Sequence, residues 1–318
     1  MSRSAIVRAA IVLVAWLVLL TFPQWSQAWE SSRYATGIIR QILIFAIFAS
    51  SLNLLVGYAG LPSLGHAAFF GGGAYAAAIA AERLATDQLL VSLVAAIAGA
   101  ALLAFVVGFL AVRALGIFFL MLTLALAQMV FAVAYQAADL TGGSNGFSGV
   151  HRPTLLGLDF SAANDLYVLV SVAFLVVVLL LWRITTSSYG RALVGVRENE
   201  RRMRALGYDT RTLKLSAFVL AGAIAGVAGA LSSYEFRFVS PNDVALGTSV
   251  TGFVMVLIGG AGTLLGPVVG ATVVLLIERA LPSQVPAQIV LGAVFILFVV
   301  FARQGIVGAV RGLLRARP

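Results

Sequence analysis

The chain has 318 residues, of which 61% are hydrophobic and 10% are charged, whereas a soluble domain carries roughly 25% charged residues. This composition excludes a soluble globular domain and predicts an integral membrane protein, because no soluble fold of this length buries so large an apolar fraction. The formal net charge is +9, but the arginines lie mainly between apolar runs, so the charge indicates orientation in a membrane and no nucleic-acid partner. The lack of cysteine excludes disulfides and thiolate metal sites, and two histidines are too few for a histidine-built metal site.

Apolar runs long enough for transmembrane helices follow one another along the chain. A bilayer core roughly 30 Å thick needs about 20 apolar residues per helix, and the loops between the runs are short. We therefore predict an all-α polytopic membrane protein with about ten transmembrane helices, some short or interrupted by glycine, in a single domain over residues 1–318. The predicted spans lie near residues 5–22, 37–57, 62–81, 89–111, 114–134, 165–182, 213–233, 247–260, 263–279 and 287–302.

The first apolar run also has features of a signal peptide. Arg3 and Arg8 precede it, and the small-residue pattern Ser26-Gln27-Ala28 follows it. We favour an uncleaved first span, and cleavage would leave the topology of the remaining chain unchanged.

The distribution of charge sets the predicted orientation. With both termini in the cytoplasm, 15 of the 21 basic residues lie on the cytoplasmic side and 9 of the 12 acidic residues lie outside, as the positive-inside rule requires. Residues 248–277 form either one interrupted helix or a hairpin around 259–262, and we prefer the hairpin because a single helix would place the arginine-rich C-terminus outside. The two longest polar segments, where partners can dock, are the cytoplasmic segment 184–213 and the extracytoplasmic loop 136–164.

Glycine interrupts a pair of apolar segments in each half of the chain, at 57–73 and at 259–270. In transporters such pairs often line the substrate path, because broken backbone at membrane depth must face protein or water. A second glycine pattern allows close helix contact, either within the chain or with another subunit. In this pattern glycines recur every four residues, at Gly222 and Gly226 and at Gly262, Gly266 and Gly270.

Several polar side chains lie in otherwise apolar spans. An unsatisfied hydrogen-bonding group there costs a few kcal/mol, so each must contact protein or water. An interhelical hydrogen bond and a position on a translocation path both remain open for these residues. A proton relay through the histidine would need an acidic partner, and the predicted span interiors contain none, which also argues against an ion-coupled secondary transporter. The path candidates are Asn53, Ser63, His66, Thr123 and Gln128.

The cytoplasmic stretch 190–207 has the spacing of an amphipathic helix. Glu198 and Glu200 each stand four residues before an arginine, the favourable order for pairs worth about 0.2 to 0.5 kcal/mol. The residues alone leave two interpretations open, a helix lying on anionic lipid or one seated in a groove of a cytoplasmic partner. The apolar positions are Leu193, Val196, Met203 and Leu206.

Five stretches of the chain resemble the permeases of branched-chain amino acid ABC transporters, the LivM type, and the resemblance covers about residues 50 to 300. The cytoplasmic stretch carries the pattern Gly190-Arg-Ala, Arg197-Glu-Asn-Glu200 and Ala205-Leu-Gly207, although Arg201, Arg202 and Arg204 stand where small or apolar residues are common in the family. The other matches are Asn53–Gly60 with Ser63–Phe70 and Gly73-Ala-Tyr75, Met121–Ala125 with Gln128, Thr141–Gly146, and Gly259–Thr263 with Gly266-Pro267.

The resemblance implies a permease subunit, without catalytic residues, of an ATP-driven importer in the bacterial plasma (inner) membrane. It implies as partners a second permease, two cytoplasmic ATPase subunits that bind the ATP, and an extracytoplasmic substrate-binding protein, together with membrane lipid. The cargo would be branched-chain or related amino acids, with urea, short amides and aromatic acids as relatives. The residues expected to couple to the ATPase are Gly190, Arg191, Arg197, Glu198, Asn199, Glu200 and Gly207.

No cofactor or metal site is predicted in this chain. An ion-coupled secondary transporter of small polar solutes is the main alternative, and it should carry carboxylates at membrane depth. An intramembrane enzyme or respiratory subunit would require paired acids, a histidine cluster or cofactor ligands within the spans, and the sequence shows none of these.

Overall fold

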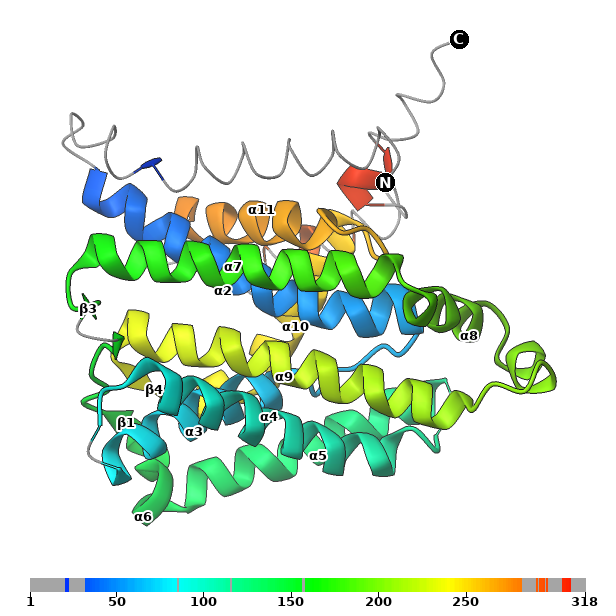
Figure 1. Cartoon of the computed structure of the whole chain (residues 1–318), viewed down its shortest axis with the longest axis horizontal. Helices are drawn as coiled ribbons and strands as arrows, with labels where there is room; N and C mark the ends of the chain where they lie inside the picture. Colours follow the sequence, from blue (N-terminus) through cyan, green and yellow to red (C-terminus); the bar gives the residue numbers. More distant parts are fainter. Residues whose placement is uncertain are drawn as a thin grey trace, which may run out of the picture.

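The computed structural model describes residues 21–22, 32–84, 86–114, 116–155, 158–281, 290, 292–294, 296 and 305–309. Long helices run side by side along the longest axis of the molecule (Figure 1). The predicted spans 5–22 and 287–302 lie outside the described residues, apart from a few positions at 21–22, 290, 292–294 and 296.

Helices account for most of the described chain. Helix α2 (Ser32–Asn53) continues into the π-helical segment η2 (Leu54–Ala59). The other helices are α3 (Ala67–Arg83), α4 (Leu89–Ala111), α5 (Ile117–Gln136), α6 (Ala138–Thr141), η3 (Gly143–Asn145), α7 (Ala163–Thr186), α8 (Ser188–Ala205), α9 (Thr210–Phe236), η4 (Pro241–Asp243), α10 (Leu246–Gly259) and α11 (Gly266–Ala280).

Six helical segments in the described part are long and apolar enough to cross a membrane. They confirm a helical, multi-pass membrane protein. Helices α3 and α11, with 17 and 15 residues, are shorter than the roughly 20 residues typical of a crossing and are not among these six. The six segments are Tyr34–Ala59, Leu89–Ala111, Ile117–Gln136, Ala163–Thr186, Thr210–Phe236 and Pro241–Gly259.

Helix α3 begins five residues later than the predicted span at 62–81. Gly60 adopts a left-handed conformation (φ 70°) at the end of η2, and Pro62 then lacks the N–H that a continuing helix needs. Ser63 and His66 are fully buried within this irregular segment. The polar side chains of this irregular segment are therefore enclosed by protein, as an apolar surrounding requires.

The core of the bundle is built on small residues of α9 facing α3 and α4. A Cβ added at Gly73 of α3 would lie 2.4 Å from the Cα of Gly226, and one added at Gly226 would lie 2.5 Å from the Cβ of Ala100. Gly222 meets Ala104 of α4 in the same way, at 2.3 Å. The repeated glycines therefore serve close helix contact within this chain.

Helices α10 and α11 form the predicted antiparallel hairpin. A Cβ at Gly259 would lie 1.8 Å from the carbonyl oxygen of Gly266, and a Cβ at Gly270 would lie 1.8 Å from that of Met255. The two helices thus touch backbone to backbone at these glycines, an approach that a larger residue would prevent. The single interrupted helix, the other interpretation of this stretch, is excluded.

Four short strands lie at one end of the bundle, where the all-α prediction expected only loops. Strand β1 (Phe147–Ser148) pairs antiparallel with β4 (Phe238–Val239), and β2 (Thr154–Leu155) pairs with β3 (Leu158–Asp159). Strands of two residues have no periodic pattern that a sequence could reveal. The pairing of β1 with β4 ties the loop 136–164 to the end of α9.

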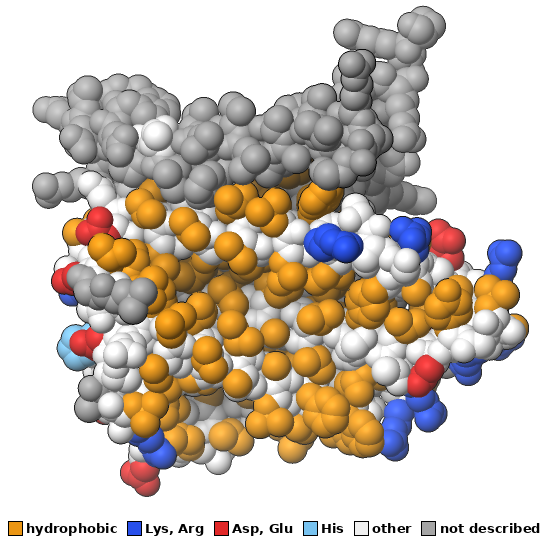
Figure 2. All heavy atoms as spheres, viewed as in Figure 1, with side chains coloured by type: hydrophobic (Ala, Val, Ile, Leu, Met, Phe, Trp, Pro, Cys, Tyr) orange, Lys and Arg blue, Asp and Glu red, His pale blue; other side chains and the backbone are white. Residues whose placement is uncertain are grey.

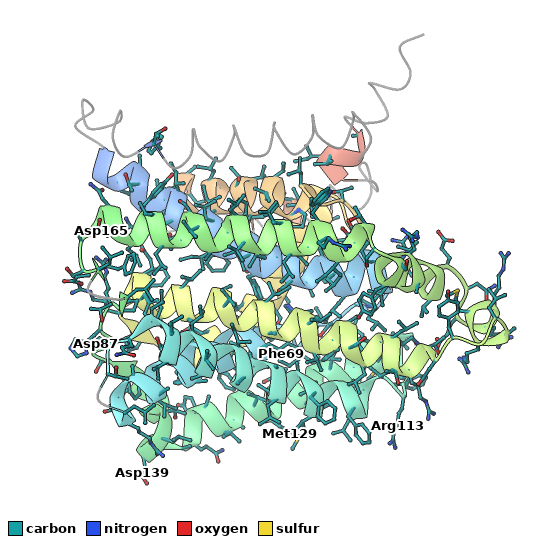
Figure 3. The ribbon with its side chains drawn as sticks, viewed as in Figure 1. Phe69, Asp87, Arg113, Met129, Asp139 and Asp165 are labelled. Carbon is teal, nitrogen blue, oxygen red and sulfur yellow. The ribbon has the colours of Figure 1, made fainter. Side chains whose placement is uncertain are left out.

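The two ends of the bundle differ in charge. Figure 3 shows Arg113 at one end and Asp87, Asp139 and Asp165 at the other. We call these the basic end, which also carries α8, and the acidic end. Between them, the visible face is largely apolar, and most of the Lys and Arg side chains on it lie at the basic end (Figure 2). This distribution is that of a protein with an apolar belt in the bilayer.

Burial separates central from peripheral helices. In the most apolar window of the α2–η2 segment 78% of residues are buried, and in that of α9 67%, against 28% for α4, 22% for α5 and 28% for α7. Helices α2 and α9 therefore form the centre of the described chain, and α5 is the least covered. Its outward side chains include Phe118, Met121 and Met129, exposed by 71%, 58% and 65%.

Candidate functional site: the α8 junction

Helix α8, which projects beyond the basic end of the bundle (Figure 1), consists of two helical pieces. Asn199 between them has a non-helical backbone (φ −157°, ψ 92°), and its Oδ1 accepts a hydrogen bond of 2.9 Å from the N–H of Arg202. Asn199 therefore acts as an N-cap for the second piece, a role that asparagine fills well. The prediction of one continuous amphipathic helix over 190–207 is wrong at this residue.

Because of the break at Asn199, the two predicted ion pairs have different outcomes. Glu200 and Arg204 both follow it and form an ion pair of 3.2 Å. Glu198 and Arg202 lie on opposite sides of it, so they no longer share a helix face, and the described contacts include no ion pair between them.

The predicted apolar stripe of α8 is divided in the same way. Leu193 and Val196 are buried against the bundle, whereas Leu206 is 66% exposed. Met203 folds back instead, and a Cβ added at Gly195 would lie 2.7 Å from its sulfur.

Arg197 joins α8 to the segment that follows α2. Its Nη1 donates a hydrogen bond to the carbonyl oxygen of Gly57, inside the π-helical segment η2. Its aliphatic stem lies against Gly60, where an added Cβ would approach the Arg197 Cγ to 2.5 Å. Carbonyl groups in the last turn of a helix have no intrahelical partner and can accept such a bond, and π-helical turns are frequent at functional sites.

The turn between α10 and α11 also lies beside Arg197 and the end of η2. The side chain of Asn53 donates from Nδ2 to the carbonyl oxygen of Thr263 (2.9 Å) and accepts at Oδ1 from the N–H of Gly262 (2.8 Å). A Cβ added at Gly262 would lie 3.3 Å from the Arg197 Nη1. The two glycine-interrupted segments noted in the sequence, one in each half of the chain, therefore meet beneath α8, with Gly57 as part of the contact.

Glu200 fastens the second piece of α8 to α9. Its carboxylate accepts from Lys214 Nζ at 2.6 Å and from Thr210 Oγ1 at 3.1 Å. Burial alone would raise the pKa of Glu200, but the hydrogen bond and charge of Lys214, with the Thr210 hydroxyl and Arg204, hold that pKa below its ordinary value. Glu200 thus faces the bundle, whereas Glu198 is exposed.

The remaining coupling candidates lie at the ends of α8. A Cβ at Gly190 would lie 2.5 Å from the carbonyl oxygens of Ile184 and Thr185, so glycine permits the sharp bend between α7 and α8. Arg191 is exposed and donates to the carbonyl oxygen of Thr186, which satisfies the end of α7. Gly207 adopts a left-handed conformation (φ 87°) just beyond the end of α8.

The path candidates divide by burial. Asn53, Ser63, His66 and Thr123 are between 0 and 3% exposed, and Gln128 of α5 is exposed. His66 shares a hydrogen bond of 2.8 Å with Ser51 Oγ, and Thr123 Oγ1 donates to the carbonyl oxygen of Leu120. The first four are therefore held inside the subunit, and Gln128 is the candidate that faces outward.

Sequence reasoning missed a buried ion pair near the acidic end. Arg40 of α2 pairs with Glu235 of α9 through Nε and Oε2 at 2.6 Å, and its Nη1 donates to the carbonyl oxygen of Ala163. The side chains of Arg40 and Glu235 are 8% and 7% exposed, so each depends on the other. An arginine inside an apolar run was the available signal, but its partner lies 195 residues away.

The apolar outer face, the differently charged ends and the two glycine-interrupted segments that meet beneath α8 define a multi-pass membrane protein with transporter-like architecture. A family model described as the permease component of branched-chain amino acid transport systems matches residues 34–302. The chain belongs to this family, and the resemblance found in the sequence is confirmed.

Curated relatives match over most of their length. The high-affinity branched-chain amino acid transport system permease protein LivM of Escherichia coli K12 is 30% identical over 98% of this chain and 78% of its own length. LivM of Salmonella typhimurium LT2 gives the same values. A probable branched-chain amino acid transport permease protein LivM of Methanocaldococcus jannaschii is 27% identical over 71% of this chain and 75% of its own. No solved structure matches the chain significantly.

Proposed function

We propose that the chain forms half of the translocation path of an ATP-driven importer and couples through α8 to separate ATPase subunits. Two such ATPases, a second permease and an extracytoplasmic binding protein complete the assembly. The protein lies in the bacterial inner membrane and crosses it about ten times. Its basic end and both of its termini face the cytoplasm. The observation that carries the proposal is the α8 junction, where a projecting helix is hydrogen-bonded to one broken membrane segment and lies against a second.

The contacts of α8 support a mechanical role. Arg197 bonds to Gly57 in η2 and lies beside Gly262, which Asn53 in turn links to the end of α2. Lys214 and Glu200 tie the second piece of α8, beyond Asn199, to α9. A displacement of α8 by a motor subunit is thereby passed to α2, α9 and the α10–α11 turn together. Separate shifts of these elements would break charge-assisted bonds.

The exposed face of α5 is the proposed wall of the path, completed by the second permease. It offers flexible thioethers at Met121 and Met129 next to the amide of Gln128. Such a surface suits an apolar side chain carried by a zwitterion whose charges balance. The names of the LivM relatives favour branched-chain or related amino acids as cargo.

Co-purification tests the proposal directly. The full chain, extracted from bacterial membranes in mild detergent, is expected to bring an ATPase subunit with it. Charge reversal at exposed Glu198 should weaken that association while the protein still inserts, and reversal at exposed Asp165, at the acidic end, serves as the control. Uptake that continues after deletion of the ATPase would instead identify an ion-coupled secondary transporter.

A further inference from the structure

A pocket of about 490 Å³ opens at the basic end, between the end of α4 and the turn from α8 to α9. Arg113 follows α4, Arg204 belongs to the second piece of α8, and Arg211 lies in the first turn of α9. Three arginines from three different parts of the chain therefore line one cavity. The other lining residues are Val112, Glu200, Tyr208, Asp209 and Thr210.

The two acids of the pocket already have partners. Glu200 holds Lys214 and Arg204. Asp209 caps α9, accepting from the N–H groups of Arg211 and Thr212 and from the Thr212 hydroxyl at 2.6 Å. Among the described residues, no carboxylate lies within 4.0 Å of the guanidinium groups of Arg113 or Arg211. The lining thus carries three arginines against two carboxylates, and because Arg211 interacts electrostatically with Asp209, the surplus positive charge lies at Arg113.

The pocket borders an exposed apolar surface of α4. The guanidinium of Arg113 lies 4.7 Å from the centre of the Phe109 ring. Phe109 and Phe105 stack on each other and are 48% and 47% exposed on α4. A ligand seated at Arg113 would thus have a polar cavity on one side and exposed aromatic surface on the other. Arginine at the end of a span, with an aromatic ring beside it, is the arrangement of a membrane interface.

We propose that this pocket binds a phosphate group, carried by an anionic phospholipid of the leaflet at the basic end. Arg113 and Arg211 would hold the phosphate oxygens, since the planar guanidinium matches phosphate geometry. The acyl chains would lie along the aromatic face of α4. Basic pockets between membrane helices bind anionic headgroups in this way. The inference needs only the chain in a bilayer and does not rest on the proposed function.

A bound lipid would bridge the α4 end and the α8–α9 turn. It would contact the base of the projecting helix without contacting Arg197 or its partners. Removal of the lipid should therefore loosen the turn at 206–209, where Leu206 and Tyr208 are 66% and 48% exposed.

Native mass spectrometry of the full chain tests the site. The protein is released from detergent after addition of phosphatidylglycerol or of phosphatidylcholine with identical acyl chains. Wild type should retain phosphatidylglycerol preferentially. Arg113→Gln and Arg211→Gln should each lower that retention about fivefold. The double variant Arg201→Gln/Arg202→Gln removes two exposed charges of the same segment outside the pocket, and it should retain lipid as wild type does.

Three results would overturn the proposal. The first is equal retention in wild type and in Arg113→Gln/Arg211→Gln, with Arg113→Lys/Arg211→Lys tested beside it to keep charge and folding. The second is full displacement of phosphatidylglycerol by millimolar inorganic phosphate, which would make free phosphate the ligand. The third is unchanged lipid retention with loss of a co-purifying ATPase, which would assign the arginines to an acidic protein segment.

Discussion

Arg197 donates a hydrogen bond from α8 to the carbonyl oxygen of Gly57, 140 residues earlier in the chain and inside the π-helical end of α2. The contact joins the projecting basic helix to a segment that passes through the membrane. We expect Arg197→Ala to lower uptake roughly tenfold or more, because a charge-assisted bond contributes about 1.5 to 3 kcal/mol to holding the two elements together.

The expected signature of this variant is uncoupling, in which ATP hydrolysis continues while substrate uptake falls. Uptake into proteoliposomes and hydrolysis are measured on the same preparation. Arg202→Ala, which removes an exposed arginine of the same helix, is the matched control and should leave the ratio of uptake to hydrolysis unchanged. Equal ratios in both variants would exclude Arg197 as the link.

The Glu200–Lys214 pair should hold the second piece of α8 in place. Glu200→Gln is expected to cost about 1.5 to 3 kcal/mol locally, because it leaves a largely buried ammonium without its counter-charge. Faster proteolytic cleavage at 201–207 in the full chain would report the loosening. The exchange Glu200→Lys/Lys214→Glu should restore protection, and Glu198→Gln, at an exposed position, should not affect it.

The stabilisation that the Glu200–Lys214 pair provides should also depend on pH. The pKa of Glu200 is lowered in the folded protein from an ordinary value of 4.5. Its contribution to stability is therefore complete above about pH 4.5 and is lost as the pH falls through the lower folded pKa. Protease sensitivity at 201–207 should rise in that acidic window in wild type and should show no such rise in Glu200→Gln. An identical pH profile for the two proteins would contradict the assignment.

The contact of Gly226 with helix α4 should tolerate no side chain. Gly226→Ala places a Cβ 2.5 Å from the Cβ of Ala100 and 2.7 Å from the carbonyl oxygen of Ala96, so overpacking of about 1 to 3 kcal/mol is expected. Gly247→Ala, at a helical glycine with open space around it, is the control. Thermal unfolding in detergent should show a lower midpoint for Gly226→Ala alone.

Cysteine cross-linking can locate the partner of α5, since the chain has no cysteine of its own. Gln128→Cys, on the exposed face, is expected to form a cross-link to a second permease after mild oxidation or with a short thiol reagent. Thr123→Cys, on the buried face of the same helix, should remain unlinked. A link at Thr123 with none at Gln128 would place the partner on another surface.

Much of this protein was predictable because the bilayer imposes a strong local signal. Apolar runs located the described helices to within a few residues at most ends. The arginine-rich C-terminus, which a single helix would have placed outside, favoured the α10–α11 hairpin around 259–262. Five stretches, among them the one around Arg197, led to the family through local residue order. The start of α3 was missed because Pro62 and Gly65 lie in an apolar run that hydropathy reads as continuous.

The amino-acid sequence by itself therefore determined that the protein lies in a membrane, the order of its helices and the charge at their ends, and the family. Each of these depends on residues that are neighbours in the sequence. Only the tertiary structure decided which residues far apart in the sequence contact each other. Asn199 breaks α8 where helix spacing predicted continuity, Arg40 finds Glu235 across 195 residues, and Asn53 closes on Gly262 across 209. Hydrogen bonds and ion pairs act over a few ångströms, so which distant groups meet is fixed only when the helices pack.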